Sequence, residues 1–351
     1  MKWVLEHVGN NFVAHIIAPM NVCLDKTLAL FKGFNPYGVI MQCKPGKYGS
    51  KLFNLAAIIG TPVCLGFMLS QSKAAPQDLI SIVMEMLGKY LPSDQSHHVF
   101  TDKWFNTHAT TEAILEIGHD VTGAMDRHKY AQVFDRRLEH ARDDTMGHTA
   151  THRRYITKDG TPHVISANGV VFPHITPQKK QLQGFLSTAM HGSMMEEGNV
   201  KSLDVLQAYN ENKRSVDTFN QMVCEIEFLH KSRRFAFPLL TFCCNAAIVN
   251  SLAAYIHTEH ACVSVRQVAE AIARELVPEQ KGCILSSVDH SLCVLTLCVA
   301  YPNQLAHTAG KRHKKAVRPC TCAWFVILTF TCTKSALICI IPCTHNTCKI
   351  Y

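Results

Sequence analysis

Residues 97–107 read HHVFTDKWFNT, and this stretch decides the expected fold. The apolar run from His97 to Thr101 predicts a short strand, and Asp102 follows it directly, ahead of a helical segment. An Asp in this place is often a surface residue or a helix N-cap. Its meaning therefore depends on the segments around it. We expect His97 and His98 to be surface residues at the end of the strand.

The flanking segments of residues 1–130 alternate between strands and helices, which predicts an α/β fold. Apolar runs and helical spacing predict strands at 52–59 and 121–125 and helices at 76–90 and 110–117. Residues 131–200 are polar and lack a long periodic stretch, so they predict an insertion or a surface excursion. Residues 201–256 and 265–276 have helical spacing, whereas 279–310 stay ambiguous.

Composition allows a sizeable core and a nucleic-acid partner. The chain has 351 residues, of which 47% are hydrophobic, and a net charge of +8. This length is enough for two or three domains. Glu6 and His7 interrupt the place where a signal peptide would need an apolar run. We therefore expect a reduced, intracellular protein.

Two further Asp residues lie in comparable settings. Asp25 lies in VCLDKTLALFKGF, and Asp217 lies in NKRSVDTFNQM at the start of a helical stretch. Spacing alone is weak support for a shared site, because the chain has 27 acidic residues. Nucleophilic catalysis by a Cys/His pair has less support, since no pair is singled out.

The residues around these acids resemble the piggyBac family of DNA transposases. Phe31-Lys32-Gly33 after Asp25 resembles the family's first catalytic segment, and KPGKYG at 44–49 closely matches another of its stretches. TDKWF at 101–105 resembles the second Asp motif. Tyr209-Asn210, Val216-Asp217 and Gln221-Met222 resemble the third. The matches run in family order from about residue 20 to 257, and again at 318–348.

The resemblance implies a DDE transposase with an RNase H-like α/β core, an insertion subdomain, a following helical region and a Cys-rich, zinc-type tail. The implied parts are an N-terminal stub of a dimerisation and DNA-binding region (1–19), the first part of the core (20–130), the insertion (131–200), the last core helix (201–222), a helical dimerisation and DNA-binding region (223–310), and a basic linker with the tail (311–351). Family members usually carry a few hundred residues before the first Asp, so the chain resembles the C-terminal part of such a protein.

By this resemblance, Asp25, Asp102 and Asp217 are the catalytic residues and hold Mg²⁺ or Mn²⁺. Two such ions about 4 Å apart stabilise the attacking and leaving oxygens in many nucleases, and carboxylates are the ligands that Mg²⁺ prefers. The chain departs from the family at Lys26, where a Glu usually stands, and at Asn220, where an additional acid stands. Arg214 and Ser215 replace a pair of glycines. We expect these changes to weaken metal binding.

Basic pairs predict contacts to DNA phosphates. Lys231, Arg233 and Arg234 match a basic stretch of the family, whereas the pairs at 136–137, 153–154 and 179–180 are equally typical of solvated surface. KRHKK at 311–315 is compatible with a nuclear-import signal. We therefore expect a nuclear protein with DNA as its partner, and a homodimer if the upstream region exists.

The tail has the composition of a zinc module. Six of the sixteen cysteines lie there: Cys320, Cys322, Cys332, Cys339, Cys343 and Cys348. Zinc binds Cys and His in groups of four, typically through C-x₂-C pairs. The tail has enough ligands for one zinc ion. A second zinc ion is not expected, because Ser335 replaces a ligand and Cys320 and Cys322 are separated by one residue instead of two. The alternative is a tail of free thiols. The scattered cysteines, including Cys243 and Cys244, predict small buried apolar residues.

Three functions remain open from the sequence. The first is a piggyBac-type transposase or domesticated derivative that cuts and joins DNA. The second is a catalytically inactive, transposon-derived protein that binds DNA or chromatin. The third, a protein anchored through a membrane helix at 323–341, has least support because Lys334 would lie near the centre of the membrane.

Overall fold

The computed structural model describes residues 2–42, 46–70, 78–125, 147–172, 181–191, 193–197, 200–226, 234–259, 263–276, 292–299, 324–331 and 336–342. These residues divide into two compact units. One comprises residues 1–221 and 231–239, and the other comprises 222–230 and 240–351.

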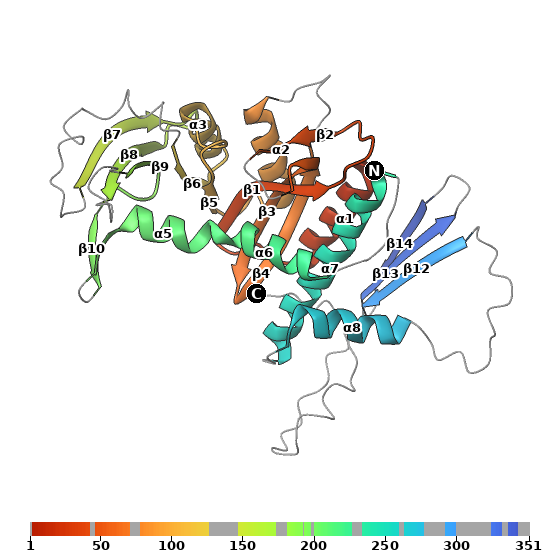
Figure 1. The fold of residues 1–351 in the computed structure, drawn as a ribbon. Helices are drawn as coiled ribbons and strands as arrows, with labels where there is room; N and C mark the ends of the chain where they lie inside the picture. The colour runs from red at the N-terminus through yellow and green to blue at the C-terminus, as the bar shows by residue number, and fades with distance from the viewer. Residues whose placement is uncertain are drawn as a thin grey trace, which may run out of the picture. The chain divides into compact units, whose positions relative to one another are not determined.

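A nine-stranded mixed sheet forms the centre of the first unit (Figure 1). Its order is β2-β3-β1-β5-β6-β9-β8-β7, with β4 also paired to β3. The strands are β1 (Asn21–Leu30), β2 (Gly38–Ile40), β3 (Tyr48–Ile59), β4 (Thr61–Leu69), β5 (His98–Thr101), β6 (Asp120–Ala124), β7 (Gly147–Ile156), β8 (Pro162–Phe172) and β9 (Gln181–Ser187).

The middle of the sheet is parallel and both of its sides are antiparallel. β5 pairs in parallel with β1 and with β6, whereas β3 and β9 pair in antiparallel fashion with β1 and β6. Parallel strands need crossover connections. The helices α2 (Leu79–Tyr90) and α3 (His108–Glu116) lie in the chain between these strands.

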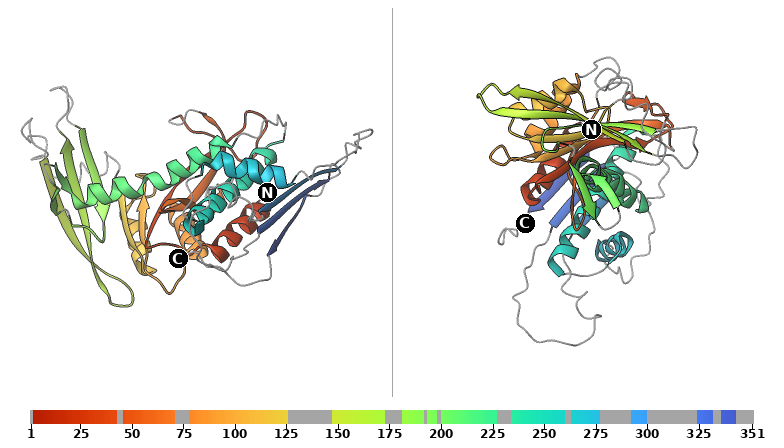
Figure 2. Two further views of the ribbon diagram at one scale, coloured as in Figure 1. Left: turned by 90° about the horizontal axis from the view of Figure 1, so that it is seen from below. Right: turned by 90° about the vertical axis from the view of Figure 1, so that its left-hand side faces the viewer.

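Helices cover the sheet and bury its apolar residues. Phe12 of α1 (Lys2–His15) packs edge-on against Phe67 of β4, with ring centroids 5.9 Å apart. α5 (Asp204–Asn212) contacts β1, β6 and β9, so it runs across the strands (Figures 1 and 2). With the start of α6 (Arg214–Glu225), it packs on a buried cluster that includes Cys23, Phe100 and Phe185.

The expected strands and helices of residues 1–130 are present, and their ends differ from the expected ones by up to four residues, the largest difference being the start of β3. β7, β8 and β9 extend the sheet through the β6–β9 pairing. β10 (Met194–Glu197) and β11 (Val200–Leu203) form a separate pair. The described parts of 131–200 thus form strands that pair mostly with their neighbours in the chain, and β9 also pairs with the distant β6.

The expectation that His97 and His98 are surface residues is wrong. Both are buried, and the imidazole of His98 lies 2.7 Å from the hydroxyl of Thr122. Burial lowers the pKa of His98. His97 donates from Nδ1 to the carbonyl of Pro19 at 2.9 Å. Both residues therefore hold neighbouring segments of the sheet together.

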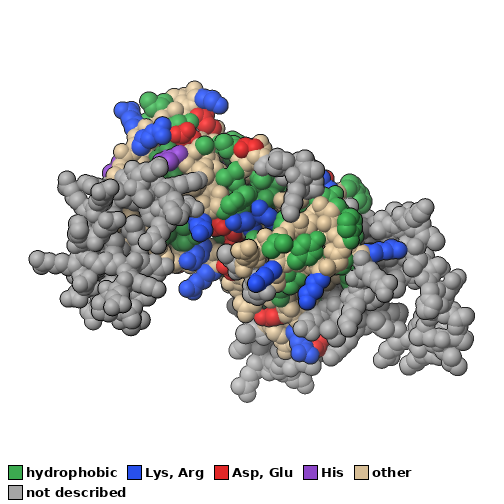
Figure 3. All heavy atoms as spheres, turned by 45° about the horizontal axis from the view of Figure 1, so that its top comes forward, with side chains coloured by type: hydrophobic (Ala, Val, Ile, Leu, Met, Phe, Trp, Pro, Cys, Tyr) green, Lys and Arg blue, Asp and Glu red, His purple; other side chains and the backbone are tan. Residues whose placement is uncertain are grey.

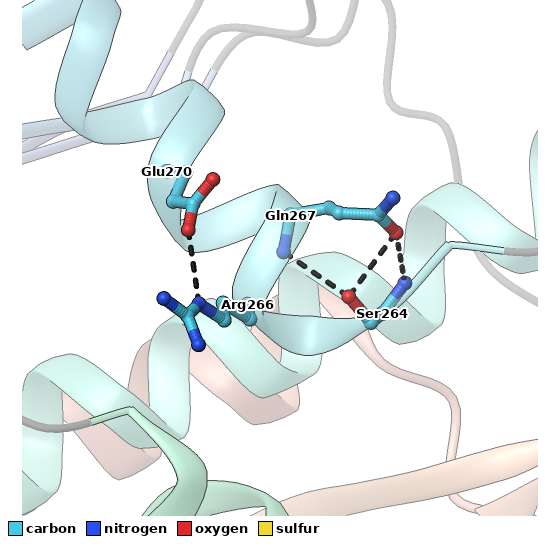
Figure 4. Close-up of polar contacts among 4 residues, drawn as sticks. All are labelled: Ser264, Arg266, Gln267 and Glu270. Carbon is cyan, nitrogen blue, oxygen red and sulfur yellow. Dashed lines mark hydrogen bonds and ion pairs between the residues drawn. The ribbon is translucent and has the colours of Figure 1, made fainter.

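The second unit contains helices and a small sheet. Most of α7 (Ala236–Glu259) belongs to it, and in this part Asn245 donates its amide hydrogens to the carbonyls of Val223 and Ile226, both at 2.9 Å. α8 (Val265–Leu276) begins with a reciprocal cap (Figure 4). Ser264 Oγ accepts from the backbone amide of Gln267, and Gln267 Oε1 accepts from the backbone amide of Ser264.

Two apolar stretches bear on the membrane alternative. Among the described residues, 236–257 of α7 are long and apolar enough to cross a membrane, and 67% of this stretch is buried, as in a core helix. The described part of 323–341 forms no helix. It belongs to β13 (Trp324–Thr331) and β14 (Ala336–Pro342), which pair with each other, and β13 pairs with β12 (Leu292–Val299). The helix that the membrane alternative requires is therefore not found in the described residues of this stretch.

Candidate active site

Asp25 and Asp102 lie next to each other at the parallel centre of the sheet. Leu24 of β1 pairs with Thr101 of β5, and Asp25 and Asp102 are the residues that directly follow these two. β5 ends at Thr101, whereas β1 continues to Leu30. Asp25 is therefore inside a strand instead of at its end, and Asp102 lies beside it.

Asp102 is held by its own loop and by a lysine. Its Oδ1 accepts hydrogen bonds from the backbone amides of Trp104 and Phe105, at 2.9 and 3.3 Å. Its Oδ2 forms an ion pair with Lys26 Nζ at 2.8 Å. Both carboxylate oxygens thus have partners, and the side chain is fixed in orientation.

Among the described carboxyl groups, Asp25 has the pKa that is furthest from its ordinary value. Burial, followed by the negative charge of Asp102, raises the pKa of Asp25 to about 6. The backbone amide of Lys26, 2.7 Å from Asp25 Oδ1, and the charge of Lys26 oppose this rise. Asp217 adds a smaller repulsion. The charge of Asp102 is therefore the second cause of the raised pKa of Asp25, after burial.

Asp217 reaches the same site from a helix. It lies in the first turn of α6, where a negative charge interacts favourably with the helix dipole. Its charge raises the pKa of Asp25, of the buried Cys23 thiol and of the Tyr209 hydroxyl, although burial is the larger cause in each case. The structure therefore brings the three predicted acids into one electrostatic neighbourhood.

Two aromatic rings and two lysines line the site beside Asp102. Trp104 is 39% exposed and stacks on Phe53, with ring centroids 5.8 Å apart. Lys26 Nζ lies 4.8 Å, and Lys51 Nζ 4.0 Å, from the centre of the Trp104 ring. Burial and then the charge of Lys26 lower the pKa of Lys51 to about 8, against the opposing effect of Asp102.

Sequence reasoning missed this role of Lys51, because its closeness to Trp104 depends on strand register. Lys51 is paired with Leu28 across β1 and β3, and Phe53 with Lys26. The only available signal was the spacing of Lys51 and Phe53, two residues apart on β3, since alternate residues of a strand share a face.

Asn220, which stands where the family has an additional acid, is engaged in a polar network. Its Oδ1 accepts from the hydroxyl of Thr27 at 2.9 Å. The amide of the fully buried Asn54 lies 3.5 Å from the same hydroxyl. Asn220 thus ties α6 to β1.

As placed, these residues do not fit a divalent metal ion. Mg²⁺ needs several oxygen ligands in a near-octahedral arrangement. Both oxygens of Asp102 already accept hydrogen bonds or pair with Lys26. Within the described ranges, no group of three His, Cys, Asp or Glu residues is arranged to hold a metal ion. Asp102 is instead paired with the positive charge of Lys26.

The other predicted site residues fall largely outside the described parts. These are Lys231, Arg233, Cys320, Cys322, Cys332, Cys343 and Cys348. Arg234 is exposed just before α7, and the backbone of Cys339 pairs with Ile327 between β14 and β13. Of the alternative basic pairs, Arg153 forms an ion pair with Glu112 at 3.1 Å.

The scattered cysteines behave mainly as expected. The thiols of Cys23, Cys64, Cys243 and Cys244 are buried, whereas Cys224 is exposed. On the face shown in Figure 3, Lys and Arg side chains lie beside acidic ones among hydrophobic residues. The described surface is therefore mixed in charge on this face.

Comparisons with known proteins agree on the family and the fold. A family model described as Transposase IS4 matches residues 3–252. A solved structure of a piggyBac transposase synaptic complex with hairpin DNA is similar at a TM-score of 0.56 and 18% identity, over 78% of this chain. The match covers 60% of that transposase chain. No curated protein matches. The family match over most of the chain shows that the protein belongs to the Transposase IS4 family, and the shared fold agrees with the resemblance to piggyBac transposases.

Proposed function

We propose that this protein is a piggyBac-type DNA transposase or a domesticated derivative, and that Asp25, Asp102 and Asp217 form its active site. The observation that carries the proposal is the place of Asp25 and Asp102 directly after the paired residues Leu24 and Thr101, together with the effect of the charges of Asp102 and Asp217, which both raise the pKa of Asp25. Family membership supports DNA as the partner. The similar piggyBac structure is a synaptic complex with DNA, which supports the same partner.

The chemistry would be cleavage and joining of phosphodiester bonds. When bound, a divalent metal ion would stabilise negative charge on the reacting oxygens. The three Asp residues would attract it only once Lys26 Nζ has left Asp102 Oδ2. The amides of Trp104 and Phe105 would keep Asp102 in place. We include Mg²⁺ or Mn²⁺ in the proposal on the basis of family membership alone.

A second candidate function is a catalytically inactive derivative that binds DNA or chromatin. The ion pair between Lys26 and Asp102 favours it, because this pair occupies a carboxylate that catalysis would need. The two candidates share the fold and the DNA partner. They differ in whether the protein cuts DNA.

Four finer features belong to the proposal. Residues Lys231, Arg233 and Arg234 would contact DNA phosphates, and KRHKK at 311–315 would direct the protein to the nucleus. The tail cysteines would hold one zinc ion, because thiolates are strong zinc ligands. A homodimer would form if the chain is part of a longer protein that carries the upstream region.

A DNA nicking and strand-transfer assay with Mn²⁺ or Mg²⁺ tests the proposal. The transposase predicts metal-dependent cleavage that is lost in Asp102→Asn and kept in Asp94→Asn, which alters an exposed Asp in the loop before β5. Cleavage that persists in Asp102→Asn would contradict the assigned site. A folded protein that binds DNA without cutting it would favour the second candidate.

A further inference from the structure

We propose that Lys26 is a built-in counter-cation, which occupies the place beside Asp102 that a divalent cation would take and so sets the affinity of the site for metal. This inference rests on the proposed function, because it concerns the same site. The ion pair between Lys26 Nζ and Asp102 Oδ2, at 2.8 Å, carries it.

This ion pair differs from an ordinary surface pair. The side chain of Lys26 is 14% exposed and that of Asp102 is 30% exposed. Exposed pairs are screened by water and contribute little, whereas partly buried pairs are screened less. The Lys26 charge is therefore a strong competitor for Asp102.

The surroundings hold both partners in place. The Lys26 ammonium lies 4.8 Å from the Trp104 ring centre and 5.6 Å from the Phe105 ring centre, where the ring quadrupoles attract a cation. The backbone amides of the same two residues hold the other oxygen of Asp102. One short segment, Asp102 to Phe105, thus binds the carboxylate and its counter-cation together.

A divalent ion must displace this ammonium before it can reach Asp102. Displacement would cost the ion pair and the contacts with the two rings. It would also leave a positive charge close to the incoming ion. Lys26 therefore keeps metal affinity low, and its removal would leave the negative charge of Asp102 and Asp25 uncompensated.

The test is a titration of the full-length protein with Mn²⁺ alone at neutral pH, in which free Mn²⁺ is followed by electron paramagnetic resonance. We expect Lys26→Gln to bind Mn²⁺ at least about tenfold more tightly than the wild type, because a nearby like charge is removed. Lys26→Met checks the result with a side chain that cannot donate to Asp102. Lys26→Arg keeps the charge and should keep the weak affinity.

Lys103→Gln is the matched control, because it removes the same charge from an exposed residue directly after Asp102. A similar gain in Lys103→Gln and Lys26→Gln would overturn the inference, since net charge alone would then set the affinity. The absence of Mn²⁺ binding in folded Lys26→Gln and Lys26→Met would also overturn it. The nicking assay judges the proposed function separately, so the two can fail independently.

Discussion

Asp25 belongs to the proposed active site, but its ionised carboxylate lowers the stability of the folded protein. It is largely buried within β1 and faces the repulsion of Asp102 and Asp217. Resemblance to piggyBac motifs was enough to single out all three acids. The lysines and rings beside them were not predicted, because their contacts arise from pairing between strands that the sequence does not reveal.

We predict that Asp25→Asn stabilises the protein at neutral pH. The folded-state pKa of Asp25 is about 6, against an ordinary value of 3.8. The folded protein thus binds this proton more tightly than the unfolded chain, and the resulting stability is present below about pH 4 and is lost as pH rises through 6. At about 1.4 kcal/mol per pKa unit, the ionised Asp25 carboxylate lowers the free energy of unfolding at pH 7 by at most about 3 kcal/mol.

Urea unfolding at pH 7 and pH 4 checks this prediction. The free energy of unfolding of Asp25→Asn should exceed that of the wild type at pH 7, and the two should be nearly equal at pH 4. The exposed Asp94→Asn serves as the control and should show little difference at either pH. An equal gain at both pH values would contradict the electrostatic explanation.

At the scale of elements, the strand that carries Asp25 depends on close pairing with β3. Gly49 pairs with Leu30 at the end of β1. A Cβ at Gly49 would meet the carbonyl oxygen of Ala29 and would lie 2.9 Å from the Leu30 Cα. This close approach gives a physical reason for a glycine in the KPGKYG stretch.

We predict that Gly49→Ala destabilises the protein by about 1–3 kcal/mol, as overpacking usually does. Gly88→Ala is a matched change in α2, where nothing lies within 4 Å of the added Cβ. It should stabilise the helix by up to about 1 kcal/mol, because alanine has the higher helix propensity. Thermal unfolding measures both, and a neutral Gly49→Ala would show that β1 and β3 are not packed so closely.

The limits of sequence prediction at this scale follow from where the stabilising contacts lie. α2 was predictable from its own residues: helical spacing marks its buried face, and Asp78 caps it by accepting from the Ser81 amide at 3.2 Å. β7, β8 and β9 were not, because each depends on pairing with a neighbour in the sheet. The polar composition of residues 131–200 predicted only an insertion or a surface excursion.

At the scale of the molecule, the large sheet is the scaffold on which the acids meet. Residues 21–102 supply two of them on adjacent strands, and α6 adds the third more than a hundred residues later. The α/β class and the family were predictable, because local patterns and short motifs carry them. The tail cysteines stay a prediction, since most lie outside the described ranges.

The central claim is that Asp25, Asp102 and Asp217 form one charged site. The most direct measurement is a pH titration of the Asp25 carboxyl by ¹³C NMR, with the signal assigned through Asp25→Asn. We predict a midpoint near pH 6 in the wild type, because burial and the other two acids raise the pKa of Asp25 to about 6. The midpoint should fall in Asp102→Asn and, to a smaller extent, in Asp217→Asn. A midpoint near 4 in the wild type, or one that neither substitution shifts, would contradict the account.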